Sequence, residues 1–382
     1  MALPMGHDFS TILPSELLQQ CFSGFNFREL LPILGVCSRW RALALNHPTY
    51  WANIRLTRDY PGAVCLFLLR VSRTRARPFR VAVSLWPPSA AFVADVLPVI
   101  ARNLARITLL SLAVNISHGP EVLASISAPA PLLQALTLHF YNPSSECAIL
   151  LRDDMFAGTA PLLRQLVIWD VSLPRDPIPV LSSIHTLEVG DGALAVGTCL
   201  QDLFVHFPYV RRVDFCARHT TFDVAYWDAK KWETLEHVTP TAAMFDDPIL
   251  PLSLVKHMVF YIPISPQLRI MLEPLNGALQ LDLESSPGPE ILFHIRERAS
   301  PWRARTFVDD LRAWIDVNAR PAGAPHELPF TRIVNLSIPE CFWQLACGIF
   351  PTMPSVKELS LLLDEPDPLS PSSLIPAPRC LP

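Results

Sequence analysis

Hydrophobic residues near the start of the chain recur with the period of an amphipathic helix. Three such sets run over residues 17–22, 27–34 and 36–44. Apolar residues spaced three and four positions apart predict helices with a buried face. Pro14 suits the first position of a helix, and Gly35 suits the end of the second set. The sequence therefore predicts three short helices, of which Pro32 shortens or kinks the second.

The apolar side chains of these predicted helices cover more than one face. A region of about 50 residues makes only a marginal hydrophobic core by itself. Each fully buried Leu or Trp side chain contributes about 1.5–3 kcal/mol to stability, so exposed apolar side chains waste stabilisation. We therefore expect the surplus to pack against the rest of the chain, against a partner, or against both.

A second pattern, typical of strands, occupies the remainder of the chain. Four segments share the order proline, any residue, Leu or Val, two residues of any kind, Leu or Val, any residue, apolar residue. They are Pro131–Leu138, Pro161–Ile168, Pro208–Phe215 and Pro354–Leu361. The alternating apolar positions predict a strand with one face turned inward. The proline stands at the start of the strand, where no hydrogen-bond donor of the sheet is lost.

Weaker copies of this segment extend the repeat. The central apolar positions are 107, 136, 166, 187, 213, 235, 258, 281, 336 and 359. Most steps are about 21–30 residues, the length typical of leucine-rich repeats. The step from 281 to 336 predicts one missing or disguised unit near 301–313. Helical spacing over 92–104, 195–207 and 309–317 predicts helices that cover the convex side.

The expected fold is therefore an α+β or α/β solenoid with a parallel sheet, behind the three N-terminal helices. Each unit alone cannot bury its apolar face, so neighbouring units supply the core by stacking. The alternative is an ordinary α/β domain whose strands have similar composition.

Composition removes several classes of protein. Half of the residues are hydrophobic, and 39 prolines among 382 residues disfavour long helices and coiled coils. The apolar stretches are too short to span a membrane. The net charge of −4 gives no reason to expect nucleic-acid binding. Ten arginines against two acids between Arg28 and Arg80 indicate a surface for an anionic partner or, more simply, a solvated linker.

Cysteine usage and motifs give no sign of catalysis or metal binding. The nine cysteines contain no C-x-x-C pair, which disfavours zinc and suits reduced thiols in the cytoplasm or the nucleus. No signal peptide is visible at the N-terminus. Phosphate-binding, nucleophile-elbow and zinc-protease motifs are absent from the sequence. We expect a protein without enzymatic activity, cofactor or metal; an enzyme built from scattered residues is the alternative.

The N-terminal helices carry a specific family resemblance. Its residues form three blocks, which are Leu13-Pro14-x-Glu16-Leu17-Leu18, Val36-Cys37-x-x-Trp40-Arg41-x-Leu43-Ala44 and Pro48-x-x-Trp51. This order and spacing resemble an F-box, in particular the fungal variety that ends in a W-x-x-I-x-L strand. The repeats behind these helices resemble the irregular leucine-rich-repeat region found after many fungal F-boxes.

The resemblance implies that this module docks onto the Skp adaptor of a cullin–RING ubiquitin ligase. The residues that would lie on the adaptor surface or support it are Leu13, Pro14, Leu17, Leu18, Leu30, Val36 and Cys37. Trp40 and Trp51 would tie the module to itself and to the rest of the chain. Cys21 stands where the family usually has Ile, and Pro32 is a second departure. The alternative is a helical cap for the core behind it.

Residues that alternate with the buried positions of the predicted strands would face a groove. They are Thr108, Thr137, His139, Tyr141, Val167, Trp169, Glu188, Asp214, Ser337 and Ser360. Neighbouring strands would bring His139, Tyr141 and Trp169 together, and aromatic residues are favoured anchors at protein interfaces. We therefore predict that Thr137, His139, Tyr141, Trp169, Glu188 and Asp214 bind a protein substrate. The alternative for Trp169 is packing under a loop.

These expectations divide the chain into four parts. They are an F-box over 9–56, an arginine-rich linker and solenoid cap over 57–103, a degenerate repeat domain over 104–363, and a disordered Pro/Ser-rich tail over 364–382. Together they predict the substrate-recognition subunit of a Skp–cullin–F-box (SCF) ubiquitin ligase, with an unknown protein substrate. An F-box scaffold or assembly protein that acts outside a ligase is the alternative.

Overall fold

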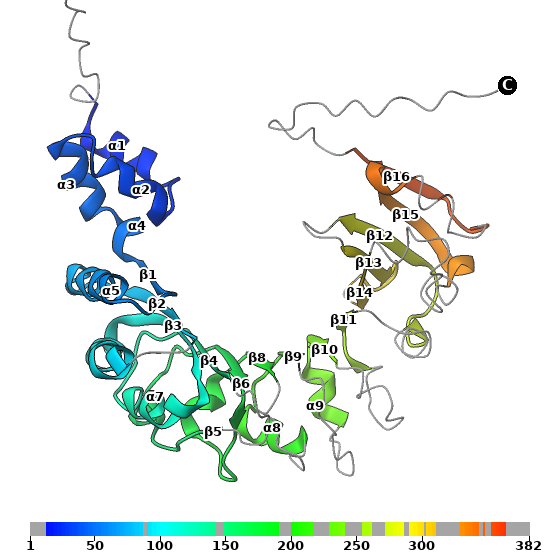
Figure 1. The fold of residues 1–382 in the computed structure, drawn as a ribbon. Helices are drawn as coiled ribbons and strands as arrows, with labels where there is room; N and C mark the ends of the chain where they lie inside the picture. Colours follow the sequence, from blue (N-terminus) through cyan, green and yellow to red (C-terminus); the bar gives the residue numbers. More distant parts are fainter. Residues whose placement is uncertain are drawn as a thin grey trace, which may run out of the picture. The chain divides into compact units, whose positions relative to one another are not determined.

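The structure is a computed structural model, and it forms two compact units that are described separately (Figure 1). Unit 1 runs over Met1–Lys231 and unit 2 over Trp232–Pro382. The residues described are 13–86, 90–141, 149–190, 200–216, 229–240, 254–261, 272–285, 290–301, 303–310, 329–343, 347 and 353–363. The predicted tail over 364–382 and the first residues of the predicted F-box lie outside the described residues.

Unit 1 begins with the three predicted helices and one more short helix. They are α1 (Ser15–Phe22), α2 (Phe27–Ile33), α3 (Ser38–Asn46) and α4 (Pro48–Trp51). Asn26 caps α2 in a capping box with Glu29, which satisfies N–H groups at the start of the helix. Pro32 lies in the last turn of α2, and the helix ends one residue later, so α2 is short, as expected.

The helices enclose a small core of their own. Phe22, Leu30 and Ala44 are buried in it, and the ring of Trp40 meets Phe22 edge-on with 5.6 Å between ring centroids. Leu18 is also buried. Several other apolar side chains of this region remain exposed, so the core uses only part of the apolar surface that the sequence supplies.

Acidification should destabilise this helical region through His47. The ring is buried, and its Nδ1 accepts a hydrogen bond from the backbone N–H of Thr49 at 3.3 Å. Burial lowers the pKa of His47, against a smaller opposing effect of the Gln19 backbone. The unfolded chain therefore binds more protons once the pH falls below about 6.5, so this stabilisation is complete above that pH and declines below it.

Urea unfolding at about pH 7.5 and about pH 5.5 measures this effect. The loss of stability between the two pH values should be smaller in His47→Gln than in the unmodified protein, because glutamine can still accept from Thr49 but does not titrate. An equal loss in both proteins would show that His47 does not carry the effect.

The sheet of unit 1 starts directly after α4. Strand β1 (Asn53–Leu56) pairs in parallel with β2 (Phe79–Ser84), and α5 (Pro61–Arg73) connects them. Arg70 of α5 is buried and donates hydrogen bonds to the carbonyls of Tyr50 and Asn53. We expected residues 57–103 to be a linker and cap. They instead contribute a strand to the sheet, β2, and the helix α5 that connects it to β1.

The main sheet of unit 1 has the strand order β1-β2-β3-β4-β6-β8-β9, and each neighbouring pair is parallel. The later strands are β3 (Ile107–Asn115), β4 (Ala135–Tyr141), β6 (Gln165–Trp169), β8 (Thr186–Val189) and β9 (Arg212–Phe215). β5 (Ile149–Leu150) and β7 (Val171–Ser172) form a separate pair. The predicted parallel sheet is therefore confirmed.

Helical segments connect these strands. They are η2 (Phe92–Val96), α6 (Leu97–Asn103), η3 (Leu104–Arg106), η4 (Ile116–His118), α7 (Gly119–Ser125), η5 (Met155–Gly158), η6 (Pro179–Ser183) and α8 (Leu200–His206). The first three cover the helix that we predicted over 92–104. α8 lies within the helix predicted over 195–207, of which 195–199 lie outside the described residues.

The proline of the repeated segment makes the same turn in each copy. The N–H of the residue two positions after the proline donates to the carbonyl of the residue before it, which is a turn with proline at its second position. These bonds are Leu133 to Ala130, Leu163 to Ala160, Val210 to Phe207 and Val356 to Met353, at 3.1–3.3 Å. The proline thus fixes where each strand begins.

The alternation predicted from the sequence is present in these strands. In β4, Leu136, Leu138 and Phe140 are fully buried, and the residues between them are half-buried. The same alternation continues in β6, β8 and β9. One face of the sheet therefore forms the core of unit 1, and the other carries the polar and aromatic side chains.

Unit 2 departs from the expected all-parallel order. Its strands are β10 (His237–Thr239), β11 (His257–Tyr261), β12 (Leu279–Ser285), β13 (Glu290–Glu297), β14 (Ala304–Asp310), β15 (Ile333–Pro339) and β16 (Glu358–Leu362). Their order is β10-β11-β14-β13-β12-β15-β16, in which β13 is antiparallel to both neighbours and the other pairs are parallel.

The strands of unit 2 correct three sequence predictions. The stretch between 281 and 336 holds two further strands in place of one disguised repeat unit. Asp309 and Asp310 belong to β14, so the helix predicted over 309–317 does not begin there; residues 311–317 lie outside the described ones. The strand predicted around 235 begins at His237, after α9 (Ala229–Thr234) and a turn.

The core of unit 2 lies on one face of its sheet. Alternate residues of β12, β13 and β15 are buried together with Phe330 of η9 (Phe330–Arg332) and Phe342 of η10 (Glu340–Phe342). Arg305 of β14 is also fully buried, and burial lowers its pKa to about 10. Within the described part of the chain, no helix has both the length and the apolar character needed to cross a membrane.

Candidate functional site

The N-terminal helices expose part of the apolar surface that the sequence predicted to contact a partner. Leu13, Pro14, Leu17 and Val36 are exposed; Leu17 retains 48% and Val36 59% of its accessible surface. Phe25 and Leu31 add two more exposed apolar side chains to the same region. We call Leu13, Pro14, Leu17 and Val36 the apolar surface of the helical region.

Arg39 brings the two ends of this apolar surface together. Its guanidinium donates to the carbonyl of Leu13 and, at 3.4 Å, to the hydroxyl of Ser15. Arg39 lies in the first turn of α3, shortly after Val36 in the chain. The start of α1 and the start of α3 are therefore held side by side, which places the Leu13 segment next to the Val36 segment.

The other predicted adaptor residues are placed differently. Leu30 is buried in the core of the helical region and Leu18 is also buried, so both support the surface without being part of it. Cys37 is half-buried, and its sulfur accepts from the backbone N–H of Trp40 as the N-cap of α3. Cys21 and Pro32, the two departures from the family pattern, are both exposed.

A second candidate surface lies on the sheet of unit 1. Register places His139 of β4 opposite Trp169 of β6, and their ring centroids are 5.1 Å apart. The ring of Tyr141 lies 4.2 Å from His139, and that of Trp86 lies 5.1 Å from Tyr141. The four rings form a continuous row, the aromatic cluster, and three of them were predicted from the sequence to lie together.

Trp86 was missed by sequence reasoning. It follows the end of β2 and is exposed. Residues 57–103 were interpreted as a linker and solenoid cap, so no strand was expected to bring Trp86 beside Tyr141, the last residue of β4. The alternation over Phe79–Ser84 is the signal that could have revealed it.

Glu188 and Gly190 fix the position of Trp169. The indole Nε1 donates to Glu188 Oε1 at 3.2 Å. A Cβ at residue 190 would lie 2.0 Å from the Trp169 ring, so only glycine leaves room for the indole there. Trp169 is half-buried. Its indole is thus held against the sheet, with part of its surface open to a partner.

The polar members of the predicted substrate site surround this cluster. Asp214 lies opposite Glu188 in the pairing of β8 and β9, and Thr137 lies on β4 two residues before His139; both are half-buried. Burial lowers the pKa of His139, so its imidazole is uncharged at neutral pH. Two carboxylates therefore border an uncharged aromatic row, an arrangement suited to a polypeptide segment with apolar or basic side chains.

Among the described residues, no group of three or more His, Cys, Asp or Glu side chains is arranged to hold a metal ion. Neither candidate surface therefore contains a metal site within the described part of the chain. What both surfaces offer is apolar and aromatic contact area, which is the chemistry of protein–protein interfaces.

Comparison with known proteins identifies the N-terminal module. No curated protein matches the chain in sequence. The F-box-like family model matches residues 11–57, which include α1 to α4 and β1. F-box domains generally bind the Skp adaptor, so this match agrees with the exposed apolar surface at the start of α1 and α3. The N-terminal region of this chain is an F-box-like domain.

Proposed function

We propose that this protein is the substrate-recognition subunit of an SCF-type ubiquitin ligase. The observation that carries the proposal is that the F-box-like domain has a core of its own and still exposes Leu13, Leu17 and Val36. In an isolated protein these side chains would lose the stabilisation that burial provides. A Skp adaptor seated on them, with a cullin attached to it, supplies that burial.

The remainder of the chain presents the substrate in this proposal. We propose that its strands form an irregular leucine-rich-repeat solenoid of the fungal type and that the aromatic cluster recruits a protein. Trp and Tyr rings bury a large area with few rotatable bonds, which makes them effective anchors. Recruitment raises the effective concentration of the substrate near the ubiquitin donor, so the chain needs no catalytic group of its own. We place it in the cytoplasm or the nucleus.

Two variants separate the two halves of this proposal. Leu13→Ala/Pro14→Ala should lose the Skp adaptor and the cullin from affinity-purified complexes and keep the recruited proteins. Trp169→Ala should keep the adaptor and lose proteins whose ubiquitylation depends on the unmodified chain. Trp343→Ala, which removes an exposed indole of unit 2, is the matched control and should lose neither.

The result also decides between a ligase subunit and a scaffold. Recovery of the adaptor without any cullin, and no change in ubiquitylation on removal of the chain, would assign it to a scaffold outside a ligase. Undiminished adaptor recovery with Leu13→Ala/Pro14→Ala would contradict the docking surface itself.

A further inference from the structure

Unit 2 carries a polar groove on the face of its sheet opposite the hydrophobic core. Its volume is about 620 Å³. Side chains of β11, β12, β13 and β14 form its floor, and Leu362 of β16 and Pro301 contribute apolar walls. We call it the unit 2 groove; it shares no described lining residue with the apolar surface of the helical region or with the aromatic cluster.

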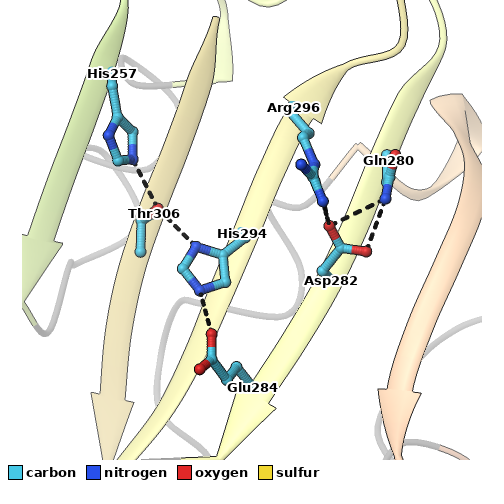
Figure 2. Close-up of polar contacts among 7 residues, drawn as sticks. All are labelled: His257, Gln280, Asp282, Glu284, His294, Arg296 and Thr306. Atoms are coloured by element: carbon cyan, nitrogen blue, oxygen red, sulfur yellow. Dashed lines mark hydrogen bonds and ion pairs between the residues drawn. The ribbon is translucent and has the colours of Figure 1, made fainter. Parts of the chain in front are cut away.

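A chain of hydrogen bonds crosses the floor of the groove, as Figure 2 shows. His257 Nε2 lies 3.0 Å from Thr306 Oγ1, which lies 2.9 Å from His294 Nδ1. His294 Nε2 lies 3.2 Å from Glu284 Oε2. The chain joins four neighbouring strands, so it fixes the side chains that a ligand would meet.

The donors and acceptors of this chain match with uncharged imidazoles. An ionised Glu284 only accepts, so Nε2 of His294 donates to it. Nδ1 of a neutral His294 then accepts from the hydroxyl of Thr306, whose oxygen accepts from Nε2 of His257. In this arrangement the histidines bring no positive charge into the groove.

The order carboxylate, imidazole, hydroxyl resembles a nucleophilic triad, but burial argues against attack by Thr306. The residue is only 3% exposed, and two imidazoles flank its oxygen. A nucleophile must reach the reacting carbon of a substrate. The chain therefore shapes the floor of a binding site.

Arg296, the one arginine among the described residues that line the groove, is already neutralised. It forms an ion pair with Asp282 through two of its nitrogens, and Gln280 donates to both oxygens of the same carboxylate. Asp282 thus has its partners within the protein. An anionic ligand would have to compete with Asp282 for Arg296, so the groove does not favour anions.

Asp282 and Arg296 neutralise each other. When His294 is neutral, the negative charge of Glu284 therefore has no positive partner among the described residues that line the groove. Its side chain is 68% exposed, and Oε1 has no hydrogen-bond partner among the described residues. The hydroxyl of Ser337, on β15 opposite Asp282, likewise has none among them. Both point to a ligand that donates hydrogen bonds and carries positive charge.

We propose that the unit 2 groove binds an extended basic segment of a protein, with an Arg or Lys side chain paired to Glu284. The aliphatic stem of that side chain packs on the half-exposed Leu362, and its charged end reaches the carboxylate. This inference rests on the proposed function, because the protein bound here is the recruited substrate, held at a second contact besides the aromatic cluster.

Fluorescence anisotropy with the full chain bound to the Skp adaptor tests the proposal. The probe is a fluorescein-labelled peptide of alternating Arg and Ser, compared with the same peptide carrying Glu in place of Arg. Glu284→Gln should weaken binding of the Arg peptide about tenfold, the effect of losing one charge-assisted hydrogen bond. The variant keeps an acceptor for His294, and equal thermal unfolding midpoints would show that it folds.

Glu273→Gln is the matched control, because it removes the same charge from an exposed position of unit 2 outside the groove. Glu273→Gln should bind the Arg peptide with the affinity of the unmodified protein. The Glu peptide should bind neither to this variant nor to the unmodified protein. Equal loss in both variants, no loss in Glu284→Gln, or binding of the Glu peptide would overturn the proposal. Failure to bind the adaptor would instead refute the proposed function, and the peptide comparison can then be made on the full chain alone.

Discussion

Replacing Leu17 with aspartate should reduce the affinity of this protein for the Skp adaptor by a factor of about 100 or more. Leu17 is exposed on α1, next to buried Leu18, so the change leaves the core of the F-box-like domain intact. In the complex the new carboxylate would be buried against an apolar surface without a partner. That burial costs several kcal/mol, which is the origin of the expected loss.

Leu66→Asp is the matched control for Leu17→Asp. Leu66 lies on α5, outside the F-box-like domain, and is 39% exposed. Calorimetric titration of each purified variant with the adaptor measures this effect. Leu66→Asp should bind the adaptor with the same affinity as the unmodified protein. Full affinity of Leu17→Asp, or equal losses in both variants, would remove Leu17 from the interface.

Replacing Arg70 with methionine should lower the free energy of unfolding by about 3–5 kcal/mol. Arg70 is 3% exposed; its Nε donates to Tyr50 and its Nη2 to Asn53, each at 2.8 Å. Its guanidinium also lies 3.7 Å from the centroid of the Phe27 ring. Methionine fills the space but removes the donors to the buried Tyr50 carbonyl and the part-buried Asn53 carbonyl, and it removes the cation–π contact.

Lysine should rescue this site only in part. Its ammonium is a compact charge that cannot reproduce the planar, two-pronged contact of a guanidinium stacked on an aromatic ring. Arg73→Met, on the exposed side of the same helix, is the matched control and should change stability little. Urea unfolding measures all three variants. A loss in Arg70→Met no larger than in Arg73→Met would show that Arg70 does not link the F-box-like domain to the sheet.

Arg70 also changes the interpretation of the arginine-rich stretch. The sequence suggested an anionic partner or a solvated linker, because it shows that the stretch is rich in arginine but not which groups each guanidinium contacts. Burial lowers the pKa of Arg70 to about 10, so it stays protonated at neutral pH in an environment of carbonyls and aromatic rings. Arg77 stacks over Trp51 in a similar way, at 4.9 Å from the ring centroid. Several of these arginines therefore join elements of the fold.

Local periodicity was enough to predict the N-terminal helices and several strands of unit 1. The three N-terminal helices follow from spacing within each helix, and the strands at 136, 166, 187 and 213 follow from alternation after a turn. His139, Tyr141 and Trp169 could be grouped because parallel strands in register place equivalent positions side by side. Each of these inferences needs only short-range pattern and one regular pairing.

Partner choice among the strands of unit 2 was decided by the tertiary structure. β12 and β13 have the same alternation as the other strands, but β13 pairs antiparallel with β12 and β14, and the three strands lie in reversed order. Alternation specifies which face of a strand is buried and not which strand lies beside it. The unit 2 groove, built from side chains on these strands, was for this reason invisible in the sequence.

The sequence by itself determined the helical module with its exposed leucines, the parallel strands and the aromatic row, because each depends on residues close in the chain or on one repeated step. The tertiary structure decided the role of residues 57–103, the arrival of Trp86 beside Tyr141, the burial of Arg70 and the polar chain from His257 to Glu284. These depend on contacts between distant segments, whose pairing is selected by packing of the whole unit and leaves no periodic signal in the chain.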